Sequence, residues 1–355
     1  MENSSKFLKV LSELNGVPGN ETQVKRFMET ELKDYVDEIT FDNIGSIIGK
    51  KVGKADGPRI MVAGHMDEVG FMVSKITKDG YLRILPLGGW WSQVVLAQQV
   101  TVTTSQGKEY HGVIGSKPPH VLSAEERKKP VDLKNVFIDL GVKDKEAVEK
   151  LGVEIGDMVT PYIEFREMAN PDYLLGKAWD NRIGCAVAIE VAKNLKAEKH
   201  ENNLFAVGTV QEEVGLRGAS TAANKINPDI GIAVDVTIAD DIPGGDSECN
   251  FGDGPAILVY DGGLVGHRGL RKQIIEVAEK HEIPYQISFL RGGATDAGKM
   301  SLAHDGAPSV SIGIPSRYIH SHTSMIHRKD YENCVKLITE LVKTLDTETV
   351  NKITY

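Results

Sequence analysis

The sequence predicts an α/β fold in which helices cover both faces of a mixed sheet and a smaller β-rich domain interrupts the chain. Apolar, strand-like runs alternate with helical patterns near both ends of the sequence. The middle of the chain instead has short strand-like runs separated by turn residues. We therefore predict one α/β domain formed by residues 1–67 and 166–355, with residues 68–165 inserted as a second domain.

The amino-terminal part begins the α/β domain. Residues 20–36 have helical spacing, and their apolar face is formed by Val24, Phe27, Met28, Leu32 and Val36. Strand-like runs at 39–41 and 46–48 follow, on either side of a turn at 43–45. A further strand begins at residue 59 and ends at His65.

The inserted segment reads as a small β domain. Its six predicted strands are 69–73, 81–85, 99–104, 109–114, 136–139 and 157–160. The turn at 78–80 joins the first two as a hairpin, and the turn at 105–107 joins the next two. Residues 116–130 are polar and contain three prolines, which predicts a loop.

The carboxyl-terminal part returns to alternating elements. Helices are predicted at 181–195, 268–282, 296–302 and 329–345, and strands at 204–210, 231–235, 285–290 and 309–314. This alternation is typical of a sheet that is covered on both faces.

Composition excludes several classes of function. The chain has 355 residues and a net charge of −9, which argues against nucleic acid as a partner because phosphate binding needs a basic surface. No run of about 18 apolar residues predicts a membrane span, and the first six residues have no apolar signal core. The three cysteines are widely spaced, which favours a reduced, cytoplasmic chain with cysteines in its core.

Side chains that bind metals lie next to several of these predicted elements. Two glutamates follow the strand 204–210, and single polar residues lie beside four other elements. The set comprises His65, Asp180, Glu212, Glu213, Asp235 and His320. Because sites form at the ends of strands, we expect these residues to converge. Nitrogen and oxygen donors without cysteine favour two neighbouring zinc or cobalt ions.

Simpler interpretations exist for the individual residues. His65 taken alone is more often structural, although Asp67 could hold it or a neighbouring group. Asp180 could cap the helix that follows it, but its two oxygens could also bridge two ions. Asp235 could start a turn.

The paired glutamates admit two interpretations. Glu212 and Glu213 could be a surface acidic pair, which the apolar run before them makes the weaker alternative. If the strand continues through them, they point to opposite sides, so that one binds metal and the other exchanges protons with water. His320 and His322 would share a side of an extended segment, and their spacing does not decide which of them is a ligand.

Other catalytic signatures are missing. The sequence has no His-Glu-x-x-His, no Gly-x-Ser-x-Gly, no phosphate loop and no dinucleotide fingerprint. Residues 292–298 are glycine-rich, which is typical of a turn into a helix or of a loop close to substrate.

Six motifs together resemble the glutamyl-aminopeptidase-type metallopeptidases, the tetrahedral, self-compartmentalising aminopeptidases. They are 64–70 (GHMDEVG), 178–182 (AWDNR), 211–218 (QEEVGLRG), 233–235 (AVD), 293–298 (GATDAG) and 317–322 (RYIHSH). The likeness runs from about residue 5 to 345. It implies a zinc-peptidase-like catalytic domain, peptide substrates with a free amino terminus, and a β-rich insert that mediates dimerisation. It also implies that six dimers form a dodecamer.

The resemblance implies a role for each site residue. One metal would be held by His65, Asp180 and Asp235, and the second by Asp180, Glu213 and His320. Glu212 would be the general base, and Asp67 would support the ligands. A dinuclear deacylase, another amidase or a glycan hydrolase is the alternative. The preferred first residue of the substrate stays open, with Arg217, Arg291, Lys299 and Arg317 as candidate cations for an acidic side chain.

Overall fold

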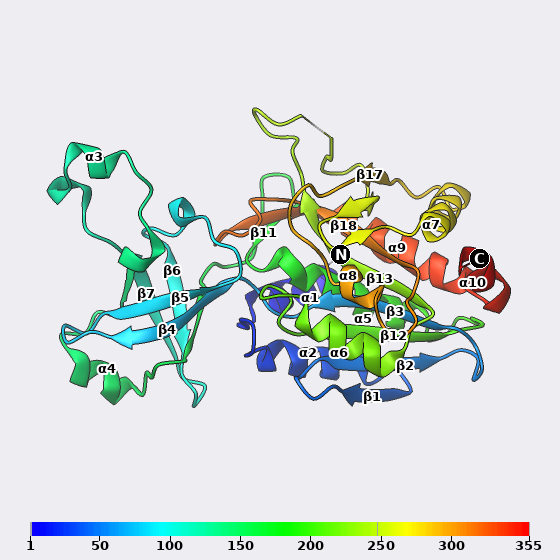
Figure 1. Cartoon of the computed structure of the whole chain (residues 1–355), viewed down its shortest axis with the longest axis horizontal. Coiled ribbons are helices and arrows are strands. Elements are labelled where there is room, and N and C mark those ends of the chain that lie inside the picture. Colours follow the sequence, from blue (N-terminus) through cyan, green and yellow to red (C-terminus); the bar gives the residue numbers. More distant parts are fainter. Residues whose placement is uncertain (1, 247, 355) are drawn as a thin grey trace.

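The chain forms a large sheet covered by helices and, beside it, a small β-barrel (Figure 1). The structure is a computed structural model that describes residues 2–246 and 248–354. Figure 1 shows the barrel at one end of the molecule and the carboxyl-terminal helix at the other. The predicted α/β fold with a β-rich insert is confirmed.

Within the described residues the main sheet has eleven strands. Nine follow one another in the order β1 (Glu38–Phe41), β2 (Ile47–Val52), β12 (Asn203–Thr209), β3 (Arg59–His65), β13 (Ile230–Ile238), β18 (Ser309–Arg317), β19 (Ser324–His327), β11 (Tyr173–Gly176) and β10 (Arg166–Glu167). The two others are β14 (Ala256–Leu258) and β17 (Gln286–Ser288), and β15 (Tyr260–Asp261) and β16 (Leu264–Val265) form a separate pair. The four central strands, β12, β3, β13 and β18, run parallel.

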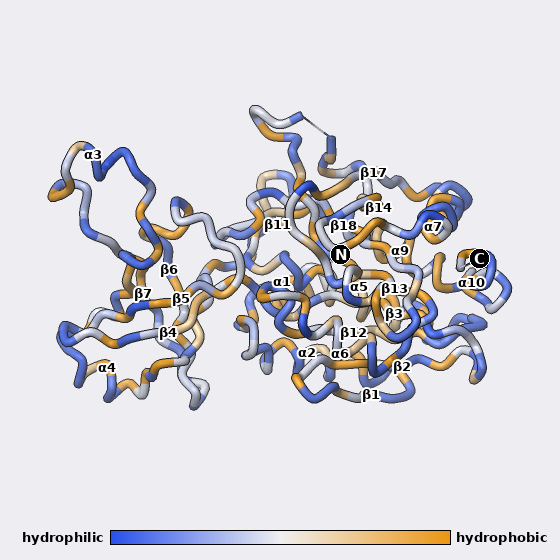
Figure 2. The backbone as a smooth tube through the Cα atoms, in the orientation of Figure 1, coloured by the Kyte–Doolittle hydropathy of each residue, from blue (hydrophilic) through white to orange (hydrophobic). Residues whose placement is uncertain are grey.

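Alternating side chains of the central strands pack on opposite faces of the sheet. In β3, Ile60 and Val62 belong to one core, whereas Met61 and Ala63 belong to another. The first core includes residues from α1 (Glu2–Glu13), α2 (Thr22–Leu32), α5 (Trp179–Asn194), α7 (Arg268–Lys280), α9 (Arg328–Thr344) and α10 (Thr347–Thr354). The second includes residues from α6 (Arg217–Ile226) and α8 (Ala297–Met300). Figure 2 shows hydrophobic residues concentrated along such inner strands.

The inserted strands close into a barrel with a hydrophobic core of its own. Its order is β4 (Gly70–Ile76), β5 (Leu82–Leu87), β8 (Phe137–Asp139), β7 (Glu109–Gly115), β6 (Gln99–Thr103) and β9 (Met158–Pro161). The helix α4 (Lys145–Leu151) lies between β8 and β9 in the chain.

Several elements differ from the prediction. The segment 116–130 is not all loop, because it contains a 3₁₀ turn (Pro119–Val121) and α3 (Ala124–Arg127). The hydroxyl of Ser123 accepts a hydrogen bond from the backbone N–H of Glu126, whose carboxylate accepts one from the N–H of Ser123. This capping box stabilises the short helix. The helices α1, α4, α6 and α10 were not predicted.

Two predictions from composition can be compared with the structure. Cys185, Cys249 and Cys334 are free and buried, as expected of core residues. No helix in the described part of the chain is long and apolar enough to cross a membrane.

Candidate metal centre

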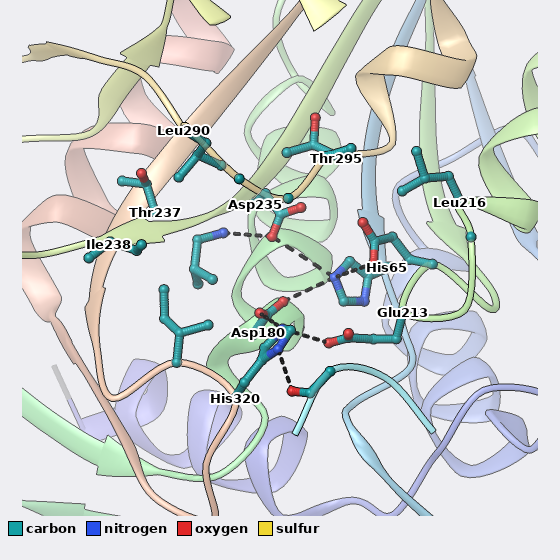
Figure 3. A pocket seen from close by; sticks show the side chains of 18 of the residues that line it. His65, Asp180, Glu213, Leu216, Asp235, Thr237, Ile238, Leu290, Thr295 and His320 are labelled. Atoms are coloured by element: carbon teal, nitrogen blue, oxygen red, sulfur yellow. Dashed lines mark hydrogen bonds and ion pairs between the residues drawn. The ribbon is translucent and has the colours of Figure 1, made fainter. Parts of the chain in front are cut away.

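The predicted ligands meet at one edge of the main sheet. His65 is the last residue of β3, the two glutamates follow β12, and His320 follows β18. With Asp180 and Asp235 they line a cavity of about 780 Å³. Figure 3 shows the side chains of His65, Asp180, Glu213, Asp235 and His320 pointing toward one another. Asp235 lies within β13 rather than at its end, because that strand continues to Ile238.

Asp180 lies between the two histidines. Its Oδ1 is 3.1 Å from Nε2 of His65, and its Oδ2 is 3.3 Å from Nε2 of His320. The backbone of Asp180 is not helical, although it lies in the first turn of α5. The capping hydrogen bond is made instead by Asn181, whose Oδ1 accepts from the N–H of Gly184 at 3.0 Å, so the capping role considered for Asp180 is wrong and its carboxylate faces the cavity.

Close backbone contact brings Asp180 near His65. Gly64, at the end of β3, packs against Gly184 of α5 so closely that a Cβ on Gly64 would lie 2.3 Å from the Gly184 carbonyl carbon. Asn181 adds a link to the neighbouring strand, because its side-chain amide donates to the carbonyl of Val234. The strand β3 can approach the helix this closely only because residue 64 is glycine, and a Cβ on Gly184 would lie 2.4 Å from the carbonyl oxygen of Val234 in β13.

His65 is surrounded by carboxylates. Its Nε2 lies 3.8 Å from Oε2 of Glu212 and 3.9 Å from Oδ1 of Asp235, in addition to the contact with Asp180. Its Nδ1 donates to the backbone carbonyl of Asp67 at 2.9 Å. A proton on Nδ1 leaves Nε2 as the nitrogen that faces the carboxylates.

The carboxylate of Asp67 holds the backbone of the paired glutamates. Its Oδ1 accepts from the N–H of Glu212 and its Oδ2 from the N–H of Glu213, both at 3.0 Å. The expectation that the two glutamates point to opposite sides is wrong, because β12 ends at Thr209 and both residues line the same cavity. Gln211 has a positive φ of 56°, which ends the extended geometry before the pair.

Glu21 was not predicted to have a role in the site. It is buried at the start of α2, and its Oε1 accepts a hydrogen bond from the N–H of Gln211 at 3.0 Å. Burial and the charge of Asp67 raise the pKa of Glu21 to about 7. Its place beside residue 211 depends on a contact between distant parts of the chain, so no local pattern indicates it.

A buried ionic network lies beneath the site. Arg182 is fully buried and donates to the carbonyls of Met66, Leu11, Leu14 and Gly16. Oε1 of Glu68 lies 3.1 Å from Arg182 and 2.6 Å from Lys177. These contacts fix the turn that follows His65.

The glycine-rich segment 292–298 lines the cavity and also leads into a helix, so both alternatives considered from the sequence apply to it. Gly292 to Thr295 line the cavity, and α8 begins two residues after Thr295. The next residue, Asp296, is buried and accepts a hydrogen bond from the hydroxyl of Thr209 at 2.5 Å. Burial raises the pKa of Asp296 to about 6.

The two histidines of the 317–322 motif have different environments. Nε2 of His320 lies 3.5 Å from Oε1 of Glu213. His322 is buried against Trp90, with 5.3 Å between the ring centroids. Burial lowers the pKa of His322 to about 4. Of the two, His320 is the one that faces the carboxylates.

Burial and mutual repulsion make the ionised forms of several carboxylates in the cluster unfavourable unless positive charge lies close by. Burial raises the pKa of Glu212 and of Asp235 well above their ordinary values, and nearby carboxylates raise both further. Burial and the charge of Asp180 also raise the pKa of Glu213.

The histidines respond in the opposite sense to the same charges. Burial alone would lower the pKa of His65, but Glu212 and Asp180 raise it well above its ordinary value. Burial would likewise lower the pKa of His320, yet Asp180 and Glu213 raise it to about 11. The cluster therefore attracts positive charge strongly.

The donor set fits divalent cations. In each of two groups of three residues, one potential ligand atom per residue lies within 4.8 Å of the other two. The groups are His65 with Asp180 and Glu213, and His65 with Glu212 and Asp235. Ligand atoms at about 2.1 Å from a tetrahedral ion are about 3.4 Å apart, which is close to the contacts of Asp180. Oε1 of Glu213 is buried and has no hydrogen-bond partner among the described residues.

The four basic residues considered for recognition of an acidic substrate side chain have different environments in the structure. Arg317 forms an ion pair with Asp241 at 2.7 Å, and Arg217 donates to the side chain of Gln211. Arg291 lines a different cavity, whereas Lys299 lines the cavity of the ligands.

Comparisons with known proteins agree with this geometry. The sequence profile of M42 glutamyl aminopeptidase matches residues 45–337. The chain is 35% identical over 348 residues to the glutamyl aminopeptidase of Lactococcus lactis subsp. cremoris (strain MG1363), covering 98% of each protein. It is 35% identical over 343 residues to the lysyl aminopeptidase of Pyrococcus furiosus, covering 95% of this chain and 96% of that protein.

Solved structures are similar over the whole chain. The TET aminopeptidase of the marine sediment archaeon Thaumarchaeota archaeon SCGC AB-539-E09 has a TM-score of 0.97 at 42% identity, covering 99% of this chain and 100% of that one. The PhTET1 structure, described as a dodecamer, has a TM-score of 0.86 at 31% identity, covering 96% and 99%. The resemblance seen in the six motifs is confirmed. The chain belongs to the M42 glutamyl aminopeptidase family and is a metal-dependent aminopeptidase.

Proposed function

We propose that this aminopeptidase removes the first residue of peptides with two divalent ions, one held by His65, Asp180 and Asp235 and the other by Asp180, Glu213 and His320. The observation that carries the proposal is the position of Asp180, whose two oxygens face different histidines at 3.1 and 3.3 Å. A carboxylate with this geometry is suited to bridge two ions.

Zinc or cobalt bound by these residues would lower the pKa of a water molecule and stabilise negative charge on the peptide carbonyl oxygen. Glu212 takes the proton of the attacking water and passes it to the leaving amide nitrogen. The carboxylate of Asp67 positions Glu212 and Glu213 through their backbone N–H groups. Asp67 therefore acts through its neighbours rather than on the substrate.

The cavity is suited to a substrate with a free amino terminus. A charged α-amino group is attracted by the carboxylates of the cluster, whereas an acylated terminus lacks that charge. Apolar residues on the cavity wall, Val236, Ile238, Leu290 and Ile319, accept the first side chain of the peptide. Glycoside hydrolysis usually needs two carboxylates and no metal, so a requirement for metal favours peptides over glycans as substrates.

We also propose that copies of the chain assemble into a dodecamer built from dimers, with the barrel at the dimer contact. The similarity to the PhTET1 dodecamer supports the assembly. Exposed apolar side chains on the barrel, including Leu85, Val113 and Val121, support its role as a contact surface. Light scattering that gives the mass of a single chain would contradict the assembly.

The test compares Glu212→Gln with Glu213→Gln in metal-stripped protein reloaded with zinc or cobalt. Glu212→Gln should keep both ions and lose at least about 100-fold in turnover of aminoacyl chromogenic amides, the usual scale for loss of a general base. The neighbouring Glu213→Gln should lose one equivalent of metal by elemental analysis. A Glu212→Gln enzyme with a near wild-type rate would reject the assignment.

The same reloaded enzyme separates the alternatives. An aminopeptidase cleaves the free aminoacyl amides and spares their N-acetylated forms. A deacylase would cleave the acetylated forms, and a glycan hydrolase would cleave chromogenic glycosides after chelation.

A further inference from the structure

A segment of the barrel lies directly against the outer histidine of the site. The carbonyl of Gly89 accepts a hydrogen bond from Nδ1 of His320 at 2.7 Å. A Cβ on Gly88 would lie 2.9 Å from Oε2 of Glu213, and a Cβ on Gly89 would lie 3.2 Å from Nδ1 of His320. In Figure 3 a cyan part of the chain, the colour of the barrel in Figure 1, passes beside His320.

Trp90 anchors this segment in the barrel. Its ring stacks on Phe71, with 4.7 Å between centroids and an interplanar angle of 19°. Its Nε1 donates to the carbonyl of Gly70 at 3.0 Å. Phe71 is fully buried in the barrel core, so both contacts tie Trp90 to that core.

Trp90 also contacts the loop that carries His320. The ring centroids of Trp90 and His322 lie 5.3 Å apart, and His322 is only 3% exposed. The same short segment therefore contacts the loop twice, through the Gly89 carbonyl and through the Trp90 ring.

The loop has little support of its own. Tyr318 and His320 both have positive φ angles, of 65° and 55°, which are unfavourable for residues other than glycine. The hydroxyl of Ser321 donates to carbonyls within the loop. The side chain of His320 is 37% exposed, so packing alone does not fix its ring.

We propose that Trp90 is a positioning residue for the second ion, because it holds the Gly89 carbonyl that orients the ring of His320. The inference rests on the proposed two-ion function. A proton fixed on Nδ1 by this carbonyl leaves Nε2 free to bind a cation. Trp90 touches neither substrate nor ion, and its effect passes through Gly89 and His322. The barrel then supplies a part of the site that the main sheet does not contain.

The test is a cobalt titration of the full-length, metal-stripped protein, followed by visible absorption. Wild-type protein should bind two equivalents. Trp90→Leu should lower the affinity for the second cobalt ion about 10- to 100-fold, the scale for partners of metal ligands, and leave the affinity for the first unchanged. Trp90→Phe keeps an aromatic ring against Phe71 and His322 and should restore most of the affinity. Trp91→Leu is the matched control, because Trp91 is 62% exposed.

A pair of glycine variants tests separately whether the site needs the close approach of residue 88 to Glu213. Gly88 and Gly107 have similar positive φ angles, of 83° and 79°, and both lie in the barrel. A Cβ on Gly88 meets Glu213 and Val69, whereas a Cβ on Gly107 meets nothing within 4 Å. Gly88→Ala should therefore weaken the second equivalent, and Gly107→Ala should bind cobalt as wild type does.

The outcomes separate the two proposals. If wild-type protein binds two equivalents and Trp90→Leu binds both equally well, the role of Trp90 is wrong and the two-ion function stands. Equal weakening of both equivalents in Trp90→Leu would also reject a selective role. A wild-type protein that binds one equivalent would overturn the two-ion function and this inference with it.

Discussion

The two histidines of the site are held in different ways. His65 ends a central strand, has a side chain that is 1% exposed, and donates to a carbonyl only two residues away. His320 lies in a loop, has a side chain that is 37% exposed, and donates to a carbonyl 231 residues away. The inner half of the site is thus fixed by the sheet. The outer half depends on contact between the sheet and the barrel, so it can be weakened without unfolding the chain.

The largest expected effect is at the residue that joins the halves. Asp180→Ala should weaken both ions by more than about 100-fold, because it removes a shared ligand rather than a supporting group. His320→Ala should lose only the outer ion. Elemental analysis after dialysis measures both variants, and two full equivalents in Asp180→Ala would contradict the bridge.

A large effect on folding is expected beneath the inner half. Arg182→Met removes one of the two buried cations that contact Glu68 and the donor of several buried carbonyls, which should lower the free energy of unfolding by roughly 3–5 kcal/mol. Urea denaturation of metal-free protein measures this change. Lys54→Met is the control, since its pair with Glu201 is exposed and its loss should leave the free energy of unfolding nearly unchanged. If Arg182→Met and Lys54→Met changed the free energy of unfolding equally, the buried ionic network would not stabilise the inner half.

The smallest expected effect concerns substrate choice at the wall of the cavity. Lys299 lines the cavity but is exposed, so its attraction for an acidic first residue is worth about 0–1 kcal/mol. Lys299→Ala should lower kcat/KM for glutamyl relative to leucyl amides by at most about fivefold. Arg291→Ala, at the neighbouring cavity, should leave this ratio unchanged. A larger change in Arg291→Ala would reverse the assignment.

The inner half could be predicted well from the sequence. His65, Asp235 and the glutamates lie in or directly after apolar strands, and parallel strands bring such residues to one edge of a sheet. The turn before the glutamates could not be predicted. A positive φ is rare for a residue with a side chain, so nothing in the sequence predicts it at Gln211. An expectation of extended backbone through the glutamates therefore runs past the end of β12 at Thr209.

The outer half and several elements carry weaker signals. By contrast, the buried residues of α6, Gly218, Ala219, Ala222, Ala223 and Ile226, have helical spacing, so this helix could have been predicted from the sequence. Strands of two to four residues, such as β10 and β19, are too short to show a period of two. The contacts of Gly89 and Glu21 join distant residues, and no local pattern encodes them.

The contact between Gly64 and Gly184 has a consequence for how this protein can change over evolution. No side chain separates strand from helix there, so the interval between His65 and Asp180 is set by the contact of two main chains. Substitutions elsewhere in the hydrophobic interior can alter volume and stability while that interval persists. Substitutions in the surrounding core therefore leave the spacing of these two side chains unchanged, provided that both positions remain glycine.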